Sequence, residues 1–415
     1  MRVAVLGAGV VGVSSAWYLA EAGHEVTVIE RQPAAALETS FANGGQISVC
    51  HAEPWANPST PFRALRWMGR KDSPLLWRWR LDPRQFEWAL RFLWECQAYR
   101  ARANMIAILR LALYSRAKLQ ALRAATGIEY DHLERGILHV YSDEREFAHA
   151  IPQAALMCEN GCERLVKTAA ECLAIEPALA NSEARIFGGT YTAADESGDV
   201  CKFTQNLAER CARCGVTFLY NKAIDGFSAE DGRIAGVRLA GGEVLQADTY
   251  IAALGSYTPL LLRPVGVRLP IYPAKGYSAT IPLDADSVAP TVALTDDQYK
   301  LVFSRLGNRL RVAGTAEFTG YDTSVNQGRC QALLRRAFEL FPRAGKLSEA
   351  QLWAGLRPTT PGNVPYIGAT RLTNLFVNAG HGTLGWTMGC GSGQLIADMI
   401  SGRKPEIETT EYLPR

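Results

Sequence analysis

The first thirty residues alternate apolar runs with a glycine-rich turn, and the pattern predicts a strand, a helix and a second strand. Residues 2–6 (RVAVL) form a short apolar run, as in a strand that is buried on both faces. Residues 13–22 are predicted to be helical, and Gly23 suits the position just after the helix end. Residues 24–30 (HEVTVIE) predict the second strand, which ends in Glu30.

The rest of the chain adds further strands, helices and hairpins. The predicted helices cover 104–125, 207–215 and 328–341, with a last helix that ends near Ser401. The predicted strands and hairpins cover 216–220, 232–248, 249–255, 271–281, 299–313 and 375–378. No internal repeat, low-complexity tract or obvious linker separates these elements. We therefore expect two domains between which the chain crosses several times.

The turn after the first strand reads Gly-Ala-Gly-Val-Val-Gly, a pattern typical of dinucleotide-binding folds. Gly7 permits the tight turn, Gly9 lets the backbone approach a pyrophosphate, and Gly12 lets helix and strand pack closely. The helix N-terminus offers N–H groups and positive dipole to phosphates, and Glu30 can accept a hydrogen bond from a ribose hydroxyl. In this context the motif favours a dinucleotide site over a glycine-rich turn without a ligand, but it does not distinguish NAD from FAD.

A second glycine-rich stretch lies near the C-terminus. Gly380, Gly382 and Gly385 allow the backbone to lie close to a ligand, and a helix begins just beyond them. A helix N-terminus aimed at the flavin N1–C2=O edge would stabilise the anionic reduced flavin. Gly389, Gly391 and Gly393 can instead permit tight helix–sheet packing, and both roles can hold. One such turn at each end of the chain, with a β-meander between the Rossmann strands, favours FAD.

The predicted fold class is α/β. A Rossmann-type FAD-binding domain is interleaved with an α+β substrate domain that is built on a mostly antiparallel sheet. The FAD-binding domain is expected to comprise residues 1–50, 195–262 and 350–415. Residues 51–194 and 263–349 would form the substrate domain, which includes a helical segment, rich in tryptophan and arginine, over residues 55–125.

Composition and charge exclude several classes of protein. Hydrophobic residues make up 48% and charged residues 20% of the 415 positions, which excludes a disordered chain, a coiled coil and a collagen-like rod. The net charge of +3 is too balanced for a nucleic-acid-binding protein. Ten cysteines without framework spacing fit a reducing, cytoplasmic setting. Cys211 and Cys214 lack the second pair that a zinc site needs, so no metal is expected.

Five segments carry a resemblance to a known family. They are residues 3–31, ETSFANGGQIS (38–48), RLPIYPAKGYSATIP (268–282), GLRPTTPGNVPYIGATR (355–371) and residues 378–403. Through them the chain resembles the FAD-dependent amine and amino-acid oxidoreductases of the D-amino-acid oxidase and glycine oxidase type. Within this family it is most similar to the small subunits of bacterial D-amino acid dehydrogenases.

The resemblance implies an enzyme that oxidises D-amino acids with non-covalent FAD. A hydride would pass from the substrate α-carbon to flavin N5, and the imine would hydrolyse to a 2-oxo acid and ammonia. Electrons would pass to a quinone or another membrane acceptor. The alternatives are an oxidase or dehydrogenase of the same fold for glycine, sarcosine, D-proline or D-hydroxyproline, and a non-catalytic FAD-binding subunit of a larger complex.

The resemblance also assigns cofactor contacts by position. The adenosine and pyrophosphate would lie against Gly7, Gly9, Val11, Gly12, Glu30 and Arg31. The pyrophosphate and isoalloxazine would pass along Ser40, Asn43, Gly44, Gly45, Gln46 and Ile47. The adenine would lie near Ala223, and Gly255 would also contact the cofactor. The flavin would be surrounded by Gly380, Gly382, Thr383, Leu384, Gly385, Trp386 and Thr387.

Four residues are candidates for the substrate site. Arg357 can grip a carboxylate through two parallel hydrogen bonds, and its motif resembles that of the family's carboxylate-binding arginine. The alternative for Arg357 is a structural ion pair. Tyr299 resembles the family tyrosine that shares the carboxylate, with an ordinary strand aromatic as the alternative, and Tyr277 is a weaker third candidate. His381 would stabilise charge on the reduced flavin, gate the acceptor, or only pack.

Residues 55–94 combine tryptophan with arginine. Six of the nine tryptophans lie there, and eight basic against three acidic residues between 60 and 94 give a local charge of +5. This composition suits a bilayer interface, but a helical subdomain with a tryptophan core is an equal alternative. With the quinone-linked resemblance, we expect a cytoplasmic protein that binds peripherally to an anionic membrane, on the inner face of the cytoplasmic membrane.

Overall fold

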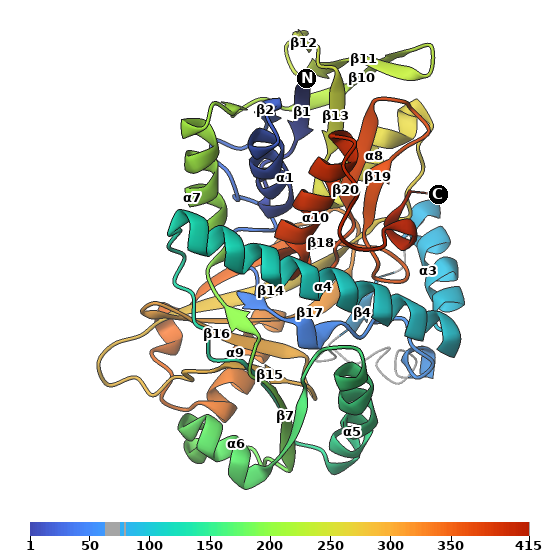
Figure 1. Ribbon diagram of the computed structural model, residues 1–415. Coiled ribbons are helices and arrows are strands. Elements are labelled where there is room, and N and C mark those ends of the chain that lie inside the picture. Colours follow the sequence, from blue (N-terminus) through green and yellow to red (C-terminus); the bar gives the residue numbers. More distant parts are fainter. Residues whose placement is uncertain (63–74, 79, 415) are drawn as a thin grey trace.

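The computed structural model describes residues 1–62, 75–78 and 80–414. Two large sheets dominate the fold and lie one above the other in Figure 1. The upper sheet has six strands in the order β19-β20-β13-β1-β2-β9. Their bounds are β1 Arg2–Leu6, β2 Glu25–Ile29, β9 Thr217–Leu219, β13 Thr249–Ala252, β19 Tyr366–Ala369 and β20 Leu375–Ala379. All neighbours are parallel except β19 and β20, so the Rossmann-type core is present.

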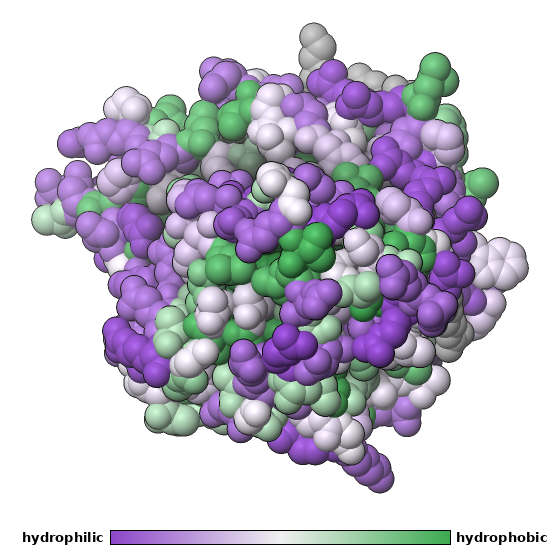
Figure 2. Space-filling model, turned by 90° about the horizontal axis from the view of Figure 1, so that it is seen from above, coloured by the Kyte–Doolittle hydropathy of each residue, from purple (hydrophilic) through white to green (hydrophobic). Residues whose placement is uncertain are grey.

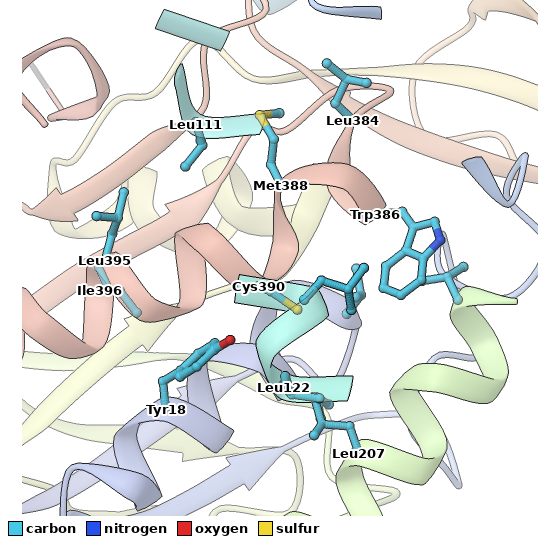
Figure 3. Packing of buried hydrophobic residues seen from close by; sticks show 14 of the residues in the cluster. Tyr18, Leu111, Leu122, Leu207, Leu384, Trp386, Met388, Cys390, Leu395 and Ile396 are labelled. Carbon is cyan, nitrogen blue, oxygen red and sulfur yellow. The ribbon is translucent and has the colours of Figure 1, made fainter. Parts of the chain in front are cut away.

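The strand β1 alternates its side chains between two hydrophobic cores, as a strand in the middle of a sheet must. Val3 and Val5 face a layer of helices, whereas Ala4 and Leu6 face the β10–β12 sheet on the other side. The helices are α1 Val10–Glu21, α4 Ala98–Thr126, α7 Val200–Arg213 and α10 Gly385–Ile400. Figure 3 shows their contact, with side chains of α10 meeting those of α1, α4 and α7.

Glycines in α10 allow the close approach of its neighbours. A Cβ at Gly391 would lie 2.7 Å from Ser115 Cα of α4, and one at Gly393 would lie 2.8 Å from Ser14 of α1. The glycines of 389–393 therefore permit close packing, but against the helices α1 and α4 and not, as was predicted, against a sheet.

The lower sheet has nine strands and is mostly antiparallel. The order is β18-β14-β17-β16-β15-β5-β7-β6, with β4 paired to β17. Their bounds are β4 Leu75–Trp77, β5 Ile137–Tyr141, β6 Leu165–Thr168, β7 Gly188–Thr192, β14 Tyr272–Pro282, β15 Ala293–Asp296, β16 Leu301–Leu306, β17 Arg309–Phe318 and β18 Gln351–Thr359. The helices around it are α3 Pro83–Glu95, α5 Glu144–Glu159, α6 Ala169–Ile175 and α9 Gln327–Leu340.

Smaller elements complete the fold. The predicted hairpin over 232–248 is formed by β11 Arg233–Leu239 and β12 Val244–Leu245, and β10 Ile224–Glu230, which was not predicted, pairs with β11 to make a three-stranded sheet. The short helix α8 Thr258–Leu262 follows. Seen from above, the surface is mostly hydrophilic, with a hydrophobic group near its centre and smaller ones towards its edges (Figure 2). The short strands β3 Gln46–Ile47 and β8 Glu196–Ser197 pair with each other, and the single turn η1 covers Val49–His51.

The sequence misjudged two parts of this organisation. The prediction of a helical segment over 55–125 is wrong at Leu75–Trp77, because these residues pair in parallel with β17. The strand β18 lies in the stretch 350–415 that was expected in the FAD-binding domain, but it pairs with β14 of the nine-stranded sheet. Of the tryptophan–arginine segment, Trp67, Trp79 and the basic residues Arg63, Arg66, Arg70 and Lys71 lie outside the described residues.

Candidate active site

A cavity of about 2000 Å³ runs between the two sheets. Its walls come from the turn after β1, the segment after β2, strands β14, β16, β17 and β18 of the lower sheet, and the turn before α10. Eighteen of the twenty-one predicted cofactor residues line it, although they come from both ends and the middle of the chain. The other three, Gly12, Ile47 and Thr387, are buried behind the wall and act by packing or by holding main chain.

The turn after β1 brings main chain to the cavity. Gly7 adopts a φ of 106°, which favours glycine, and a Cβ there would lie 2.7 Å from the Ala253 carbonyl oxygen. A Cβ at Gly12 would lie 1.9 Å from the carbonyl oxygen of Gly7, so only glycine lets α1 start this close to β1. Val10 N–H donates to Ser40 Oγ at 3.1 Å. The positive end of the α1 dipole therefore faces the cavity.

Glu30 ends β2 and is fixed by two main-chain donors. Its Oε2 accepts from Ala8 N–H at 2.8 Å and its Oε1 accepts from Gln32 N–H at 2.9 Å. Burial raises the pKa of this carboxyl above its ordinary value, against the lowering effect of these bonds. Arg31 lies beside it, with its guanidinium carbon 4.1 Å from the centre of the Tyr257 ring. This end of the cavity therefore offers the carboxylate oxygens of Glu30 as hydrogen-bond acceptors and the planar guanidinium of Arg31 as a cation.

The turn before α10 closes the opposite wall with main chain and two buried nitrogens. Gly380 and Gly382 have φ of 89° and 55°. His381 Nε2 and Trp386 Nε1 are buried and have no hydrogen-bond partner among the described residues. Burial lowers the pKa of His381 to about 3, so its imidazole is neutral at pH 7. Two unsatisfied nitrogens beside a cavity fit a bound group that carries hydrogen-bonding atoms.

Arg357 projects from β18 over a gap in the neighbouring strand. A Cβ at Gly276 would lie 2.1 Å from Arg357 Nη1, so the glycine makes room for the guanidinium. Arg357 Nη1 donates to the Thr315 carbonyl at 2.6 Å, and Nη2 donates to the Gly314 carbonyl at 3.3 Å. Thr315 has a φ of 55°, a strained conformation for a β-branched residue, which places these carbonyls at a bulge. Burial lowers the pKa of Arg357 to about 10, and no carboxylate of the described chain forms an ion pair with it.

The two predicted tyrosines lie in different places. Tyr277 is buried, lines the cavity and donates its hydroxyl to Glu317 Oε2 at 2.5 Å, so that hydroxyl is already engaged. Tyr299 does not line the cavity: it is 40% exposed and its ring lies 4.3 Å from the Arg336 guanidinium carbon. Tyr299 lies in the turn between β15 and β16. The structure therefore gives no support to shared carboxylate binding by Tyr299.

The sequence missed a polar cluster at the far end of the cavity. Cys50 Sγ lies 3.2 Å from His139 Nε2, and His139 Nδ1 lies 2.6 Å from Asp297 Oδ2. His51 stacks on His139 with ring centroids 4.5 Å apart. Burial lowers the pKa of His139 to about 4 and raises that of the Cys50 thiol. No spacing signal could reveal the cluster, because its members come from η1, β5 and the end of β15.

Comparisons with known proteins agree with this architecture. The family described as FAD dependent oxidoreductase matches residues 2–399. A D-amino acid dehydrogenase of Dechloromonas aromatica (strain RCB) is 60% identical over 412 residues, 98% of this chain and 99% of that protein. A D-amino acid dehydrogenase of Paramagnetospirillum magneticum is 56% identical over 408 residues, 98% of this chain and 96% of that protein.

Solved structures share the fold at lower sequence identity. Glycine oxidase from Geobacillus kaustophilus superposes with a TM-score of 0.78 at 22% identity, covering 100% of this chain and 98% of that one. L-proline dehydrogenase from P. horikoshii gives a TM-score of 0.77 at 18% identity, with coverage of 100% and 96%. At such identities these structures show the shared fold alone.

Proposed function

Because the chain belongs to the FAD dependent oxidoreductase family, we propose that it oxidises D-amino acids to 2-oxo acids and ammonia in the cavity between its two sheets. The observation that carries this proposal is the Arg357 guanidinium, which lines the cavity without a carboxylate partner among the described residues. A cation held in this state is stabilised when a carboxylate ligand arrives.

The glycine turns at the two ends of the chain support FAD as the cofactor. The N-terminal end of α1 would hold the pyrophosphate, Glu30 would accept from a ribose hydroxyl, and the turn of 380–386 would lie against the flavin. When bound there, FAD accepts a hydride from the substrate α-carbon. The unsatisfied nitrogens of His381 and Trp386 fit hydrogen-bonding atoms of such a group.

The residues of the chain position the substrate rather than exchange protons with it. The planar guanidinium of Arg357 would fix both carboxylate oxygens, and this orients the Cα–H bond of the substrate. Main-chain carbonyls of residues 314 and 315 hold the guanidinium from behind. Because His381 is neutral, it would donate a hydrogen bond from its N–H group and would not contribute a full positive charge. A neutral substrate amine then needs no side-chain base.

Anaerobic reduction of the flavin tests the proposal. The holoenzyme is mixed with a panel of D- and L-amino acids, glycine, sarcosine and D-proline, and the loss of flavin absorbance is followed. We expect rapid bleaching by D-amino acids and none by their L-enantiomers. Preference for glycine, sarcosine or D-proline would indicate the related oxidase or dehydrogenase activity, and no bleaching by any compound would refute catalysis.

We further propose that an anionic membrane supplies the electron acceptor, a quinone. The helix α3 supports this, because it exposes Phe86, Leu90, Leu93 and Trp94 at 44–69% while its other face contributes Trp88 and Phe92 to the cavity wall. Leu93 lies at the boundary: it lines the cavity and is 53% exposed. An apolar molecule could thus pass from this surface into the cavity. Within the described residues, no helix is long and apolar enough to cross a membrane.

Co-sedimentation with lipid vesicles tests this second proposal. We expect binding to anionic vesicles that weakens at high salt, since screening shortens the range of charge attraction to about 8 Å or less. The double variant Leu90→Gln, Trp94→Gln should bind less in both salts. The variant Leu165→Gln, which changes an exposed leucine on β6, is the matched control. Equal binding to neutral and anionic vesicles, or no binding at low salt, contradicts the proposal.

A further inference from the structure

The polar cluster at the far end of the cavity has the composition of a metal site. Cys50, His51 and His139 each offer one ligand atom, and these atoms all lie within 4.8 Å of one another. All three residues line the cavity, so an ion has a route to them. Among the described residues, this is the one group of three or more such side chains that meets the distance condition for a metal ion.

The distances agree with a tetrahedral ion. A zinc ion with Zn–S of about 2.3 Å and Zn–N of about 2.0–2.1 Å separates its sulfur and nitrogen ligands by roughly 3.6 Å. Cys50 Sγ lies 3.2 Å from His139 Nε2 and 3.7 Å from His51 Nδ1. The two nitrogens lie within 4.8 Å of each other, and the imidazole rings would adjust as the ion binds. Thiolate with imidazole is a ligand set that suits zinc.

The outer nitrogen of each histidine already has an oxygen partner. His139 Nδ1 lies 2.6 Å from Asp297 Oδ2, and His51 Nε2 lies 3.3 Å from Thr295 Oγ1. Arg164 Nη2, which only donates, lies 3.2 Å from the same Nδ1, but the shorter contact with the carboxylate favours the proton of His139 on Nδ1, and the Nε2 lone pair then faces Cys50. Carboxylate–histidine pairs of this kind orient ligands in metal sites. The parallel pairing of β5 with β15, with His139 opposite Thr295, sets this arrangement.

The backbone of Cys50 is also fixed. Its N–H donates to Asp195 Oδ2 at 3.0 Å, and its carbonyl accepts from Arg164 Nη1 at 3.1 Å. Arg164 Nη2 lies 3.2 Å from His139 Nδ1, on the side of the ring away from Cys50. Asp297, which also pairs with Lys300 at 2.8 Å, offsets this positive charge. Arg164 thus contacts the main chain of Cys50 and the Nδ1 side of His139, and neither contact uses Cys50 Sγ or His139 Nε2.

We propose that Cys50, His51 and His139 bind one zinc ion, with a fourth coordination position open to the cavity. The thiol proton of Cys50 is released to solvent as the ion binds. Three protein ligands and an open position are typical of zinc that contacts a small molecule. The site uses none of the residues proposed to bind the amino acid or the cofactor, although Thr295 links His51 to Gln46 of the cofactor segment, and it does not depend on the proposed amino-acid oxidation.

Zinc binding to the chelator-treated holoenzyme tests the proposal. Isothermal titration with zinc chloride, with metal analysis after dialysis, should give one ion per chain for the wild type. Cys50→Ser and His139→Gln should each weaken binding at least tenfold, and Asp297→Asn should weaken it about 10- to 100-fold through loss of ligand orientation. The control Cys330→Ser removes another buried thiol, on α9, and should bind as the wild type does.

A second measurement does not depend on the folding of any variant. X-ray absorption at the zinc edge of the wild type should show one sulfur at about 2.3 Å and nitrogen at about 2.0–2.1 Å. A variant with the exposed Cys158 and Cys214 changed to serine should give the same spectrum. Substoichiometric binding, a spectrum without sulfur, or equal binding by Cys50→Ser would overturn the proposal and leave a hydrogen-bonded cluster only.

Discussion

Replacement of Arg357 by lysine separates charge from geometry at the proposed carboxylate site. The guanidinium lines the cavity and is held by the Thr315 and Gly314 carbonyls at 2.6 and 3.3 Å, which fixes its orientation. Lysine keeps the positive charge but presents a single nitrogen on a flexible stem. Loss of one charged hydrogen bond costs about 1.5–3 kcal/mol, which corresponds to roughly ten- to a hundredfold in apparent affinity. We expect Arg357→Lys to raise the half-saturating substrate concentration by that factor.

Anaerobic stopped-flow reduction of the bound flavin measures this effect directly. The rate at low D-amino acid concentration should fall, while the flavin content stays that of the wild type. Arg305→Lys, on β16 of the same sheet, is the matched control and should change neither quantity. An unchanged reduction rate at low substrate in Arg357→Lys would remove Arg357 from the substrate site. Loss of flavin from Arg357→Lys would instead indicate that the substitution weakens cofactor binding.

Three further outcomes are expected. Gly12→Ala should lower the melting temperature and the FAD content, because its Cβ would lie 1.9 Å from the Gly7 carbonyl oxygen and overpacking costs about 1–3 kcal/mol. The control Gly328→Ala, whose Cβ would have its nearest contact at 3.5 Å, should change neither quantity. An unaffected Gly12→Ala variant would contradict the packing argument. The pKa of His381 is lowered to about 3 in the folded protein from about 6.5 in the unfolded chain, so the unfolded chain binds more protons and stability is lost as pH falls from about 6.5 towards 3. We expect the free energy of unfolding, measured with denaturant at several pH values, to fall less steeply with decreasing pH in His381→Gln than in the exposed control His149→Gln. An equal dependence on pH in the two variants would disprove the assignment to His381. Acid precipitation should release FAD into the supernatant, whereas flavin in the pellet would indicate a covalent bond.

Local pattern was enough to predict the elements at both ends of the chain. The run of 2–6, the three glycines and Glu30 are contiguous, so their chemistry is legible without tertiary information. The helix α1 begins three residues before the predicted start, because the last residues of the glycine-rich turn already form its first helical turn. The predicted 104–125 helix is likewise extended at its N-terminal end, to Ala98.

Features that depend on strand pairing were not predictable. Leu75–Trp77 is a strand because β17 lies beside it, and nothing in those three residues requires it. Tyr299 was a candidate for the substrate site, but it lies in a turn where its ring contacts the Arg336 guanidinium. Cys50, His139 and Asp297 meet through the pairing of β5 with β15, which joins residues more than 150 positions apart. Register between distant strands carries no local sequence signal.

The pairing of β1 with β13 has a consequence for how the protein is made. Val3 lies opposite Thr249, so β1 waits for a partner that is synthesised about 250 residues later. At about 5–20 residues per second, that interval lasts on the order of 10–50 seconds. During it, one edge of β1 is unpaired and open to other nascent chains or to a chaperone. The turn of 380–386 emerges later still, so the cavity wall is complete only after that turn has been made.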